Sequence, residues 1–526
     1  MTRVALDLGT CNTVLARLNA RTGEAETIRL QELSTPPLDG QPPLIPTALW
    51  VQDAAKGDCL AGNLALQTGH ACHPQQRLHR HFKRNLMADA PGFSPTVDGV
   101  ELTARWIGEQ FLHATLQTLR ATGETVSELV LTVPVNAFET YTQWLKNLNQ
   151  AALGCPVRLL DESTAAALGY AVTTTDEPIL VVDFGGGTLD ISLVRLARHS
   201  KQGVSGSHVP PCAQVLGKAA AWLGGDDIDQ WLLNDFLRAH DASEHELARD
   251  RGRLELLAER VKIQLSDSQE ADFVYFNPEH SSVWRKTYTR DEFEQILESH
   301  HFYVRLQSAL DQVLRQGDSH GLTRHDISHV LLIGGTSLIP AVSKFFRMAF
   351  PRDRLRNEKP FEAVAHGALL IDQRIQLDDF LHHGYGIRYW DPHRRAHDYE
   401  ELFAPGTRYP TPTPVSLTLR ASRPKQKAIE LIIGEIETTP EPLGEVFFSE
   451  GTLIRQPLAR TTSRIVPLND KGEARTLATL DPPGHPGMDR LQVDFYVDEN
   501  KHLRLSVKDL LSNSYLFEGR TILQLR

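Results

Sequence analysis

The sequence predicts an α/β region over residues 1 to about 370, followed by a separate β region from about 388 to 526. In the first region short apolar strands alternate with amphipathic helical stretches, and each strand runs into Gly, Pro or Asp. This alternation indicates a sheet with covered faces, whose ligands bind at the carboxyl ends of the strands. The expected strands of this region are Val4 to Leu8, Leu129 to Val133, Ile179 to Val182 and Val330 to Ile333.

Length and composition limit the classes of protein to consider. A chain of 526 residues is too long for one hydrophobic core, so two or three domains are expected. The net charge of −11 argues against nucleic acid or an anionic membrane as partner, and the only short basic candidate for an exception is His79 to Arg84. We find no signal-peptide segment and no apolar run that could span a bilayer. Five scattered cysteines favour a cytoplasmic location and argue against a zinc site or a disulfide framework.

Two of the expected strands lead into loops of one form: an apolar strand, then Asp, an apolar residue, Gly and Thr. The first loop is Asp7 to Thr13 and the second is Asp183 to Thr188. Glycine lets backbone N–H groups approach phosphate oxygens, threonine adds a hydroxyl donor, and aspartate can hold a hydrated Mg²⁺. A single loop of this kind is more often a plain turn after a buried strand. Two of them indicate two similar halves that grip one nucleotide from opposite sides.

A third glycine pair, Gly334-Gly335, again follows a strand. A helix is expected over Leu254 to Ser266, because apolar residues recur there at helical spacing. The apolar face consists of Leu254, Leu257, Ala258, Val261 and Leu265. Three polar residues fall within roughly 60° of one another on the opposite face: Glu259, Lys262 and Ser266. Periodicity alone favours a plain solvated surface for these three.

The β region contains one clear hairpin. Apolar residues alternate from Leu491 to Val497, an acidic turn follows, and alternation resumes from Leu503 to Val507. This pattern predicts two strands with one buried face. Further strands are expected at Leu417 to Leu419, Ile429 to Ile436 and Thr521 to Leu525.

Together these segments resemble the 70-kilodalton heat-shock chaperones, the heat shock protein 70 family of the actin, sugar-kinase and heat-shock ATPase superfamily. The segments that carry the resemblance are Asp7 to Thr13, Leu131 to Pro134 with Glu162 28 positions after Pro134, Val182 to Ser192, Leu223 to Asp227, Glu259 to Ser266 and Val330 to Pro340. Their order and separations are similar to the family's over the whole ATPase region. The resemblance implies a two-lobed actin-like ATPase with ribonuclease-H-like duplicated subdomains, followed by an all-β sandwich.

The resemblance also implies domain boundaries. Residues 1–373 would form a nucleotide-binding ATPase domain and residues 388–526 a β-sandwich substrate-binding domain without a helical lid. Residues 374–387 would form the interdomain linker, with Asp379 at its acidic position. Gln376 and Asp378 make this segment less hydrophobic than is usual in the family.

The family's roles carry over to matching positions of this chain. Catalytic roles fall on Lys83, Glu162, Asp183 and Thr188, and Mg²⁺ would be held by Asp7 and Asp183. Lys83 would stabilise charge on the transferring phosphoryl group, and Glu162 would orient or deprotonate the attacking water. K⁺ is a further candidate cation. ATP or ADP would be surrounded by Gly9, Thr10, Cys11, Asn12, Gly185, Gly186, Gly187, Gly224, Gly225, Asp226, Glu259, Lys262, Ser266, Gly334, Gly335, Ser337 and Leu338.

Several positions depart from the family pattern. Leu338 stands where an arginine usually stacks on adenine, and Phe361 replaces an aspartate near the nucleotide. Cys11 replaces a threonine of the first phosphate loop, and Asp226 replaces a glutamate that reaches the ribose. These changes keep the phosphate side and alter the adenosine side. Among positions that couple the ATPase to the linker, Thr142 replaces an arginine, while four match: Pro134, Lys146, Arg158 and Asp379.

Three functions fit the sequence. The first is an ATP-dependent, lidless chaperone whose slow hydrolysis sets the affinity of the β domain for unfolded or extended polypeptide. A J-domain cochaperone and a nucleotide exchange factor are its candidate partners, the former because Arg158 is kept. The second is a weak or inactive nucleotide switch with one dedicated protein partner. The third is a small-molecule kinase of the same superfamily, against which the linker and the β domain argue.

Overall fold

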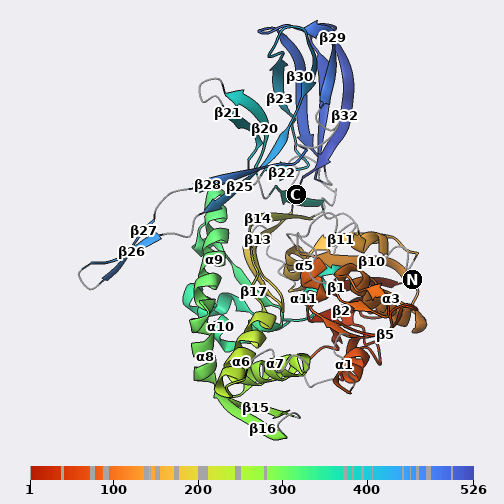
Figure 1. Ribbon diagram of the computed structural model, residues 1–526, viewed down its shortest axis with the longest axis vertical. Coiled ribbons are helices and arrows are strands. Elements are labelled where there is room, and N and C mark those ends of the chain that lie inside the picture. The colour runs from red at the N-terminus through yellow and green to blue at the C-terminus, as the bar shows by residue number, and fades with distance from the viewer. Residues whose placement is uncertain are drawn as a thin grey trace. The chain divides into compact units, whose positions relative to one another are not determined.

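A computed structural model of the chain describes residues 2–36, 41–71, 77–86, 94–134, 141, 144–148, 154–170, 177–198, 211–242, 250–277, 281–370, 376–381, 384–391, 396–404, 407–440, 444–449, 452–457, 461–469, 476–498 and 501–525. The chain divides into two compact units, Met1–Gln376 and Leu377–Arg526 (Figure 1). Among the described residues, no helix is both long enough and apolar enough to cross a membrane.

The first unit contains a six-stranded sheet, in which five strands follow the order β11-β10-β1-β2-β3 and β4 pairs with β2. Strand β1 pairs antiparallel with β2 and parallel with β10, so the Asp7 end of β1 leads directly into the hairpin turn. The apolar cores of β1 and β10 are fully buried, which explains their uninterrupted Val, Leu and Ala content. The bounds are β1 (Thr2–Leu8), β2 (Asn12–Leu18), β3 (Ala25–Thr27), β4 (Ile45–Pro46), β10 (Val126–Val133) and β11 (Val157–Asp161).

A second sheet of this unit repeats the arrangement in the order β18-β17-β12-β13-β14. Strand β12 pairs antiparallel with β13 and parallel with β17, as β1 does with β2 and β10. The two halves therefore share one topology, and the duplication expected from the paired glycine loops is confirmed. The bounds are β12 (Pro178–Phe184), β13 (Leu189–Arg198), β14 (Pro211–Ala221), β17 (His329–Ile333) and β18 (Leu355–Arg356).

Helices and short strands complete each half around its own apolar core. The first half has β5 (Ala48–Asp53), β6 (Asp58–Ala61), α1 (Gly62–Ala71), β7 (Leu78–Arg80), α2 (Phe82–Leu86), β8 (Thr96–Val97), β9 (Val100–Glu101), α3 (Ala104–Ala121) and α5 (Glu162–Gly169). The second half has α6 (Gly225–Ala239), α7 (Arg251–Asp267), β15 (Glu270–Asn277), β16 (Ser282–Thr289), α8 (Arg290–Ser299), α9 (Phe302–Ser319) and α10 (Pro340–Ala349). Helix α11 (Ala363–Leu369) follows in the sequence but packs against α5 and against β1, β2 and β10 of the first sheet.

The two halves meet where α5 crosses α11. A Cβ atom on Gly169 would lie 1.9 Å from the Ala363 carbonyl oxygen, and one on Gly367 would lie 1.8 Å from the Ala165 carbonyl oxygen. Only glycine allows backbones to approach this closely. Helix α5 begins at Glu162, so this crossing also positions that carboxyl group.

The second unit packs two main sheets face to face, β21-β20-β25-β28 and β23-β30-β31-β32. Tyr385 and Ile433 from the first sheet share one buried core with Phe495 and Leu505 from the second. The strands from Gln376 onward are β19 (Gln376–Phe380), β20 (Gly384–Asp391), β21 (Ala396–Phe403), β22 (Arg408–Tyr409), β23 (Val415–Arg420), β24 (Gln426–Glu430), β25 (Ile433–Pro440), β26 (Gly444–Ser449), β27 (Thr452–Pro457), β28 (Thr461–Pro467), β29 (Thr476–Gly484), β30 (Asp489–Val497), β31 (His502–Asp509) and β32 (Ser514–Gln524).

The expected hairpin is confirmed by β30 and β31, in which Val497 opposes Leu503 and the alternating apolar residues are buried. The single strand expected over Ile429 to Ile436 is wrong. The chain bends there and divides the segment between β24, which pairs with β29, and β25, which pairs with β20 and β28. Buried Asn469 fixes the bend, because its side chain accepts from Ile433 N at 2.8 Å and donates to the Leu431 carbonyl at 2.9 Å.

Part of the expected linker lies outside the described residues, namely 374–375 and 382–383. Residues 376–380 form β19, and residues 384–387 open β20. Thr142, the departure at a coupling position, also lies outside the described residues.

Candidate functional site

The glycine loops of the two halves face each other directly. A Cβ atom on Gly186 would lie 2.2 Å from Cys11 Sγ, and one on Gly187 would lie 3.0 Å from Thr10 Oγ1. The first loop is tight as well, since a Cβ on Gly9 would lie 2.2 Å from the Asn12 carbonyl oxygen. The strand-end residues predicted from two distant parts of the sequence therefore form opposite walls of one site.

Hydrogen bonds from the second half hold the Gly185 to Thr188 loop. Gly225 N, at the start of α6, donates to the Gly185 carbonyl at 3.1 Å, and Asp226 N donates to the Gly186 carbonyl at 2.8 Å. Thr336 Oγ1, beside the third glycine pair, also donates to Gly185 O at 2.9 Å. The first N–H groups of α6 thus find partners in the loop, which satisfies donors that a helix leaves open.

The third glycine pair is required by its surroundings. Gly334 has a φ of 78°, and a Cβ there would lie 2.4 Å from the Phe184 carbonyl oxygen and 2.9 Å from Asp183 Oδ1. A side chain would therefore be both strained and in collision with the end of β12. Gly224 is required for lack of space alone, because a Cβ there would lie 2.1 Å from the Gly186 carbonyl oxygen.

Four carboxyl groups gather around one lysine, and we name this set the carboxylate cluster: Asp7, Glu162, Asp183 and Asp190 with Lys83. Lys83 and Glu162 are buried, and Lys83 Nζ lies 3.1 Å from Glu162 Oε1. Thr132 Oγ1 donates to Asp7 Oδ1 at 2.8 Å. Asp183 and Asp190 are direct partners in the antiparallel pairing of β12 with β13.

Negative charge exceeds positive charge in the carboxylate cluster. Burial raises the pKa of Glu162 to about 7, although Lys83 opposes that shift. Burial together with the Glu162 and Asp190 charges raises the pKa of Asp183 well above its ordinary value. Burial alone would lower the pKa of Lys83, but Glu162, Tyr141 and Asp7 outweigh it and raise that pKa. Buried carboxylates in excess of cations fit a hard divalent cation such as Mg²⁺, which takes oxygen ligands.

The basic run His79 to Arg84 turns its charges toward carboxylates of the second half. We name the following pairs the paired cluster: Arg80 Nη2–Glu259 Oε2 at 2.5 Å, His81 Nδ1–Asp226 Oδ2 at 2.7 Å, Arg84 Nη1–Asp227 Oδ2 at 3.4 Å and Lys262 Nζ–Asp229 Oδ1 at 2.9 Å. Arg80, His81, Lys83 and Arg84 therefore all lie beside acidic groups of the protein itself.

Pairing sets the pKa values in this cluster. Burial alone would raise the pKa of Glu259, but Arg80 and Lys262 outweigh it and lower that pKa. Burial would likewise raise the pKa of Asp226, and contact with His81 lowers it instead. Asp229 differs, because burial raises its pKa to about 7 in spite of Lys262. Burial, with help from Asp226 and Glu259, raises the pKa of the Cys11 thiol.

The adenosine-side polar residues expected from the sequence are bonded within the protein. The solvated surface expected for α7 is wrong at Lys262, which is buried and also donates to the Gly225 carbonyl at 3.1 Å. Ser266 Oγ donates to the Lys262 carbonyl at 3.1 Å, and buried Ser337 donates to the Gly334 carbonyl at 2.6 Å. Leu338 is 37% exposed and makes no such bond.

The structure adds residues to the expected site. Asp190 is a member of the carboxylate cluster that was not expected, and Thr132 and Tyr141 lie beside the cluster. Burial raises the pKa of Tyr141 to about 12. Asp190 was within reach of sequence reasoning, because it opposes Asp183 across a short hairpin. From the sequence alone, Arg80 and His81 are only basic residues near Lys83, because no local pattern identifies their acidic partners.

Comparison with known proteins gives matches over most of the chain. A family profile described as Hsp70 protein matches residues 78–375. The chaperone protein DnaK of Deinococcus proteolyticus is 28% identical over 413 residues, which is 72% of this chain and 60% of that protein. The chaperone protein dnaK of Emiliania huxleyi is 28% identical over 397 residues, 69% of this chain and 59% of that protein.

The chain thus spans about 60% of the length of the curated relatives it matches. The duplicated α/β halves and the following β-sandwich agree with the fold expected for that profile. Because the profile covers more than half of the sequence, the chain belongs to the Hsp70 family.

Proposed function

We propose that the chain is an ATP-dependent chaperone-type protein whose first domain, residues 1–373, binds and slowly hydrolyses ATP. The observation that carries this proposal is the carboxylate cluster beside two opposed glycine loops. Carboxyl groups in excess of cations fit Mg²⁺, and loops without Cβ atoms fit phosphate oxygens. Family membership supports the same activity.

The residues of the carboxylate cluster and of the second glycine loop have the following proposed roles. Asp7 and Asp183 would hold Mg²⁺ and its waters, and the ion, when bound, neutralises phosphate charge. Lys83 would stabilise charge on the transferring phosphoryl group. Glu162, with a pKa near 7, suits a group that holds the proton of the attacking water and releases it near neutral pH. Thr188 would donate to the phosphates.

Residues 388–526 would bind unfolded or extended polypeptide as an added strand, and residues 374–387 would link this domain to the ATPase. Pro134, Lys146, Arg158 and Asp379 are the candidates for coupling the two. Arg158 is half-buried and lies 3.4 Å from Glu128 Oε1, a carboxyl group that Arg3 also contacts at 2.7 Å. A J-domain cochaperone would bind Arg158, which could exchange its contact with Glu128 for one with the cochaperone. A nucleotide exchange factor and a cytoplasmic location belong to the same proposal.

Single-turnover hydrolysis of ATP tests the proposal. The wild-type chain, with and without an unfolded peptide, is compared with Lys83→Ala and with the control Lys56→Ala, which removes an exposed lysine paired with Asp53. We expect Lys83→Ala to lower the rate by at least about 100-fold, since removing one electrostatic stabiliser costs that much. Lys56→Ala should match wild type. A wild-type chain that neither binds nor hydrolyses ATP would refute the proposal.

A second candidate is a weak nucleotide switch with a dedicated protein partner. It is favoured by the paired cluster, because Glu259, Lys262 and Ser337 already have partners that adenosine would have to displace. Hydrolysis that is insensitive to peptide would support this candidate over a general chaperone. Phosphoryl transfer to a sugar instead of water would support a small-molecule kinase.

A further inference from the structure

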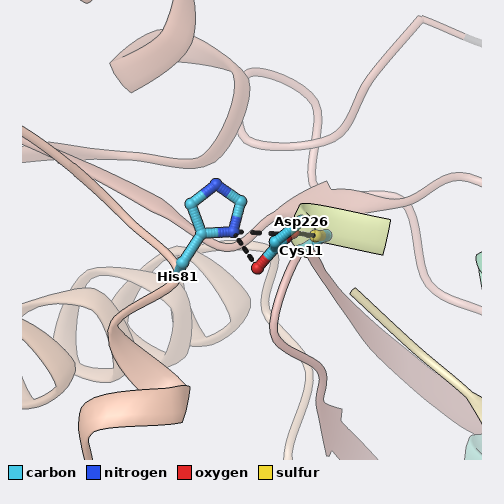
Figure 2. A group of neighbouring side chains, drawn as sticks. All are labelled: Cys11, His81 and Asp226. Atoms are coloured by element: carbon cyan, nitrogen blue, oxygen red, sulfur yellow. Dashed lines mark hydrogen bonds and ion pairs between the residues drawn. The ribbon is translucent and has the colours of Figure 1, made fainter. Parts of the chain in front are cut away.

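We propose that Cys11, His81 and Asp226 form a binding site for Zn²⁺ or a divalent ion of similar preference. Figure 2 shows the three side chains converging, with His81 Nδ1 directed toward both the carboxylate and the sulfur. One ligand atom from each residue lies within 4.8 Å of the others. The residues come from three segments, the first glycine loop, the turn before α2 and the start of α6. Metal binding of this kind goes beyond the proposed ATPase and does not depend on it.

The distances match the size of a tetrahedral zinc site. Cys11 Sγ lies 3.2 Å from Asp226 Oδ1 and 3.9 Å from His81 Nδ1, and His81 Nδ1 lies 2.7 Å from Asp226 Oδ2. Zinc bonds of about 2.3 Å to sulfur and about 2.0–2.1 Å to nitrogen or oxygen place tetrahedral ligand atoms about 3.3–3.6 Å apart. Shifts of about half an ångström, within the reach of side-chain rotation, would bring these atoms to those separations.

One feature indicates that the site can take a further partner, and a second shows how His81 is directed into it. Asp226 Oδ2 is buried and forms no well-directed hydrogen bond among the described residues, although His81 Nδ1 is close. A buried carboxylate oxygen without a proper donor is costly unless a cation occupies its free direction. His81 has a φ of 56°, an uncommon value for a residue other than glycine, and this backbone conformation directs the ring at Cys11 and Asp226.

The donor set distinguishes this site from the carboxylate cluster. One sulfur, one nitrogen and one oxygen are typical zinc ligands, and three protein ligands leave a fourth position open. Mg²⁺ prefers oxygen alone, so the carboxylate cluster suits Mg²⁺ and the mixed site suits zinc. The nearby cations do not exclude a divalent ion, because Arg80 is paired with Glu259 and Lys262 with Asp229.

A metal ion here would act on the nucleotide site. Cys11 and His81 belong to the first half and Asp226 to the second, so one ion would join the two walls. A Cβ on Gly186 would lie 2.2 Å from Cys11 Sγ, which places the site against the second phosphate loop. Cys11 and Asp226 are also residues expected around the nucleotide. Zinc and nucleotide should therefore weaken each other's binding by the same factor.

The test uses Co²⁺ as a spectroscopic substitute for Zn²⁺ on the full chain, stripped of metal with a chelator. With Mg²⁺ in excess to occupy the carboxylate cluster, we expect one thiolate-bound Co²⁺ per chain, with a thiolate-to-cobalt charge-transfer band that Zn²⁺ abolishes by competition. Cys11→Ser should remove the band. His81→Asn, which tolerates the left-handed backbone, and Asp226→Asn should each weaken binding by at least about tenfold, the lower range seen even for outer-shell changes.

The matched control is Cys59→Ser, which removes another free, half-buried cysteine and should titrate like wild type. Circular dichroism and the melting temperature of each variant check that it is folded. The proposal is overturned if wild type binds no Co²⁺, or if the folded variants bind it as tightly as wild type. In a separate assay, Zn²⁺ should lower the affinity for a fluorescent ATP analogue in wild type and in Cys59→Ser but not in Cys11→Ser. Failure of the analogue to bind refutes the ATPase and leaves the cobalt result standing.

Discussion

The carboxylate cluster and the paired cluster contain the same kinds of side chain in opposite balance. Around Lys83, four carboxyl groups share one ammonium group, and burial raises the pKa of Glu162 and Asp183. Around Lys262, each of three cations, Arg80, Arg84 and Lys262, has an acidic partner, and the pKa of Glu259 is lowered. The first arrangement has an excess of carboxyl groups that an added cation would balance, whereas in the second Arg80, Arg84 and Lys262 already have acidic partners within the protein.

We therefore expect the carboxylate cluster to bind a ligand and the paired cluster to hold the two halves together. Excess buried charge costs folding free energy and is retained where a ligand compensates it. Paired charges stabilise the fold and must be exchanged before a ligand can use them. The variants below test this division, beginning with the largest expected effect.

Replacing one carboxylate in each cluster by its amide should have opposite effects on stability. Asp183→Asn removes excess negative charge, so the melting temperature of the Mg²⁺-free chain should rise, while ATP hydrolysis should fall by at least about 100-fold. Glu259→Gln breaks the Arg80 pair and should lower the free energy of unfolding by about 1–3 kcal/mol. Thermal denaturation without Mg²⁺ and single-turnover hydrolysis measure both effects. Destabilisation by both variants would contradict the division.

The part of the stability of the Mg²⁺-free chain that depends on Glu162 should fall as pH rises from about 4.5 to about 7, while His366, whose pKa burial lowers to about 4, acts in the opposite direction below about pH 6.5. Unfolded Glu162 loses its proton near its ordinary pKa of 4.5, whereas in the folded chain that pKa is about 7. The folded state therefore holds more protons in this window, and the free energy of unfolding declines with pH. Asp229, whose pKa is also raised to about 7, adds to the decline.

Mg²⁺ should consequently raise the melting temperature more at pH 8 than at pH 5, since it binds ionised carboxylates. Glu162→Gln should flatten the pH dependence in part, and the same change at exposed Glu430, in the second unit, should not. Thermal melts at the two pH values, with and without Mg²⁺, measure this. Equal stabilisation by Mg²⁺ at both pH values would count against the carboxylate cluster as its site.

Arg80→Ala should speed nucleotide release by about tenfold. The Arg80–Glu259 pair joins the two halves and is largely shielded from water, and loss of about 1.4 kcal/mol corresponds to a tenfold change. Stopped-flow release of a fluorescent ADP analogue gives the rate. Arg17→Ala is the control, because it removes an arginine that pairs with Glu26 within one half. Unchanged release in Arg80→Ala would show that the pair does not limit opening.

Leu338→Arg should strengthen ATP binding by about fivefold. Leu338 is partly exposed and can receive a larger side chain, and a guanidinium group stacked on adenine adds about 1 kcal/mol. Leu338→Met adds bulk without charge and should leave the affinity near that of wild type. Equilibrium titration with a fluorescent ATP analogue measures both, and equal affinities for the two variants would exclude a stacking role at this position.

Local sequence signals predicted several main strands and the duplicated halves of the first unit. Strands ending in Asp and Gly gave the positions of β1, β12 and β17, and the repeated loop form indicated the duplicated halves. Strict alternation predicted the β30–β31 hairpin. These signals work because each depends on residues close together in the chain.

The charge partners could not be predicted in the same way. Arg80 and Glu259 are 179 positions apart, and Cys11 and Asp226 are 215 apart. No periodicity relates such residues, and the mixed Cys, His and Asp site lacks the short ligand spacing by which zinc sites are found in sequences. The bend before Ile433 could not be predicted for the same reason, because the side chain that holds it, Asn469, is 36 positions away.

The crossing of α5 and α11 gives the first unit a pivot. Gly169 and Gly367 bring backbone against backbone, so no interlocked side chains have to change rotamer when one helix turns on the other. Glu162 begins one of these helices, and Phe361 lies two residues before the other. A small rotation at the crossing would therefore move two groups at once, the buried carboxyl group of Glu162 and the Phe361 ring that lies beside Gly335.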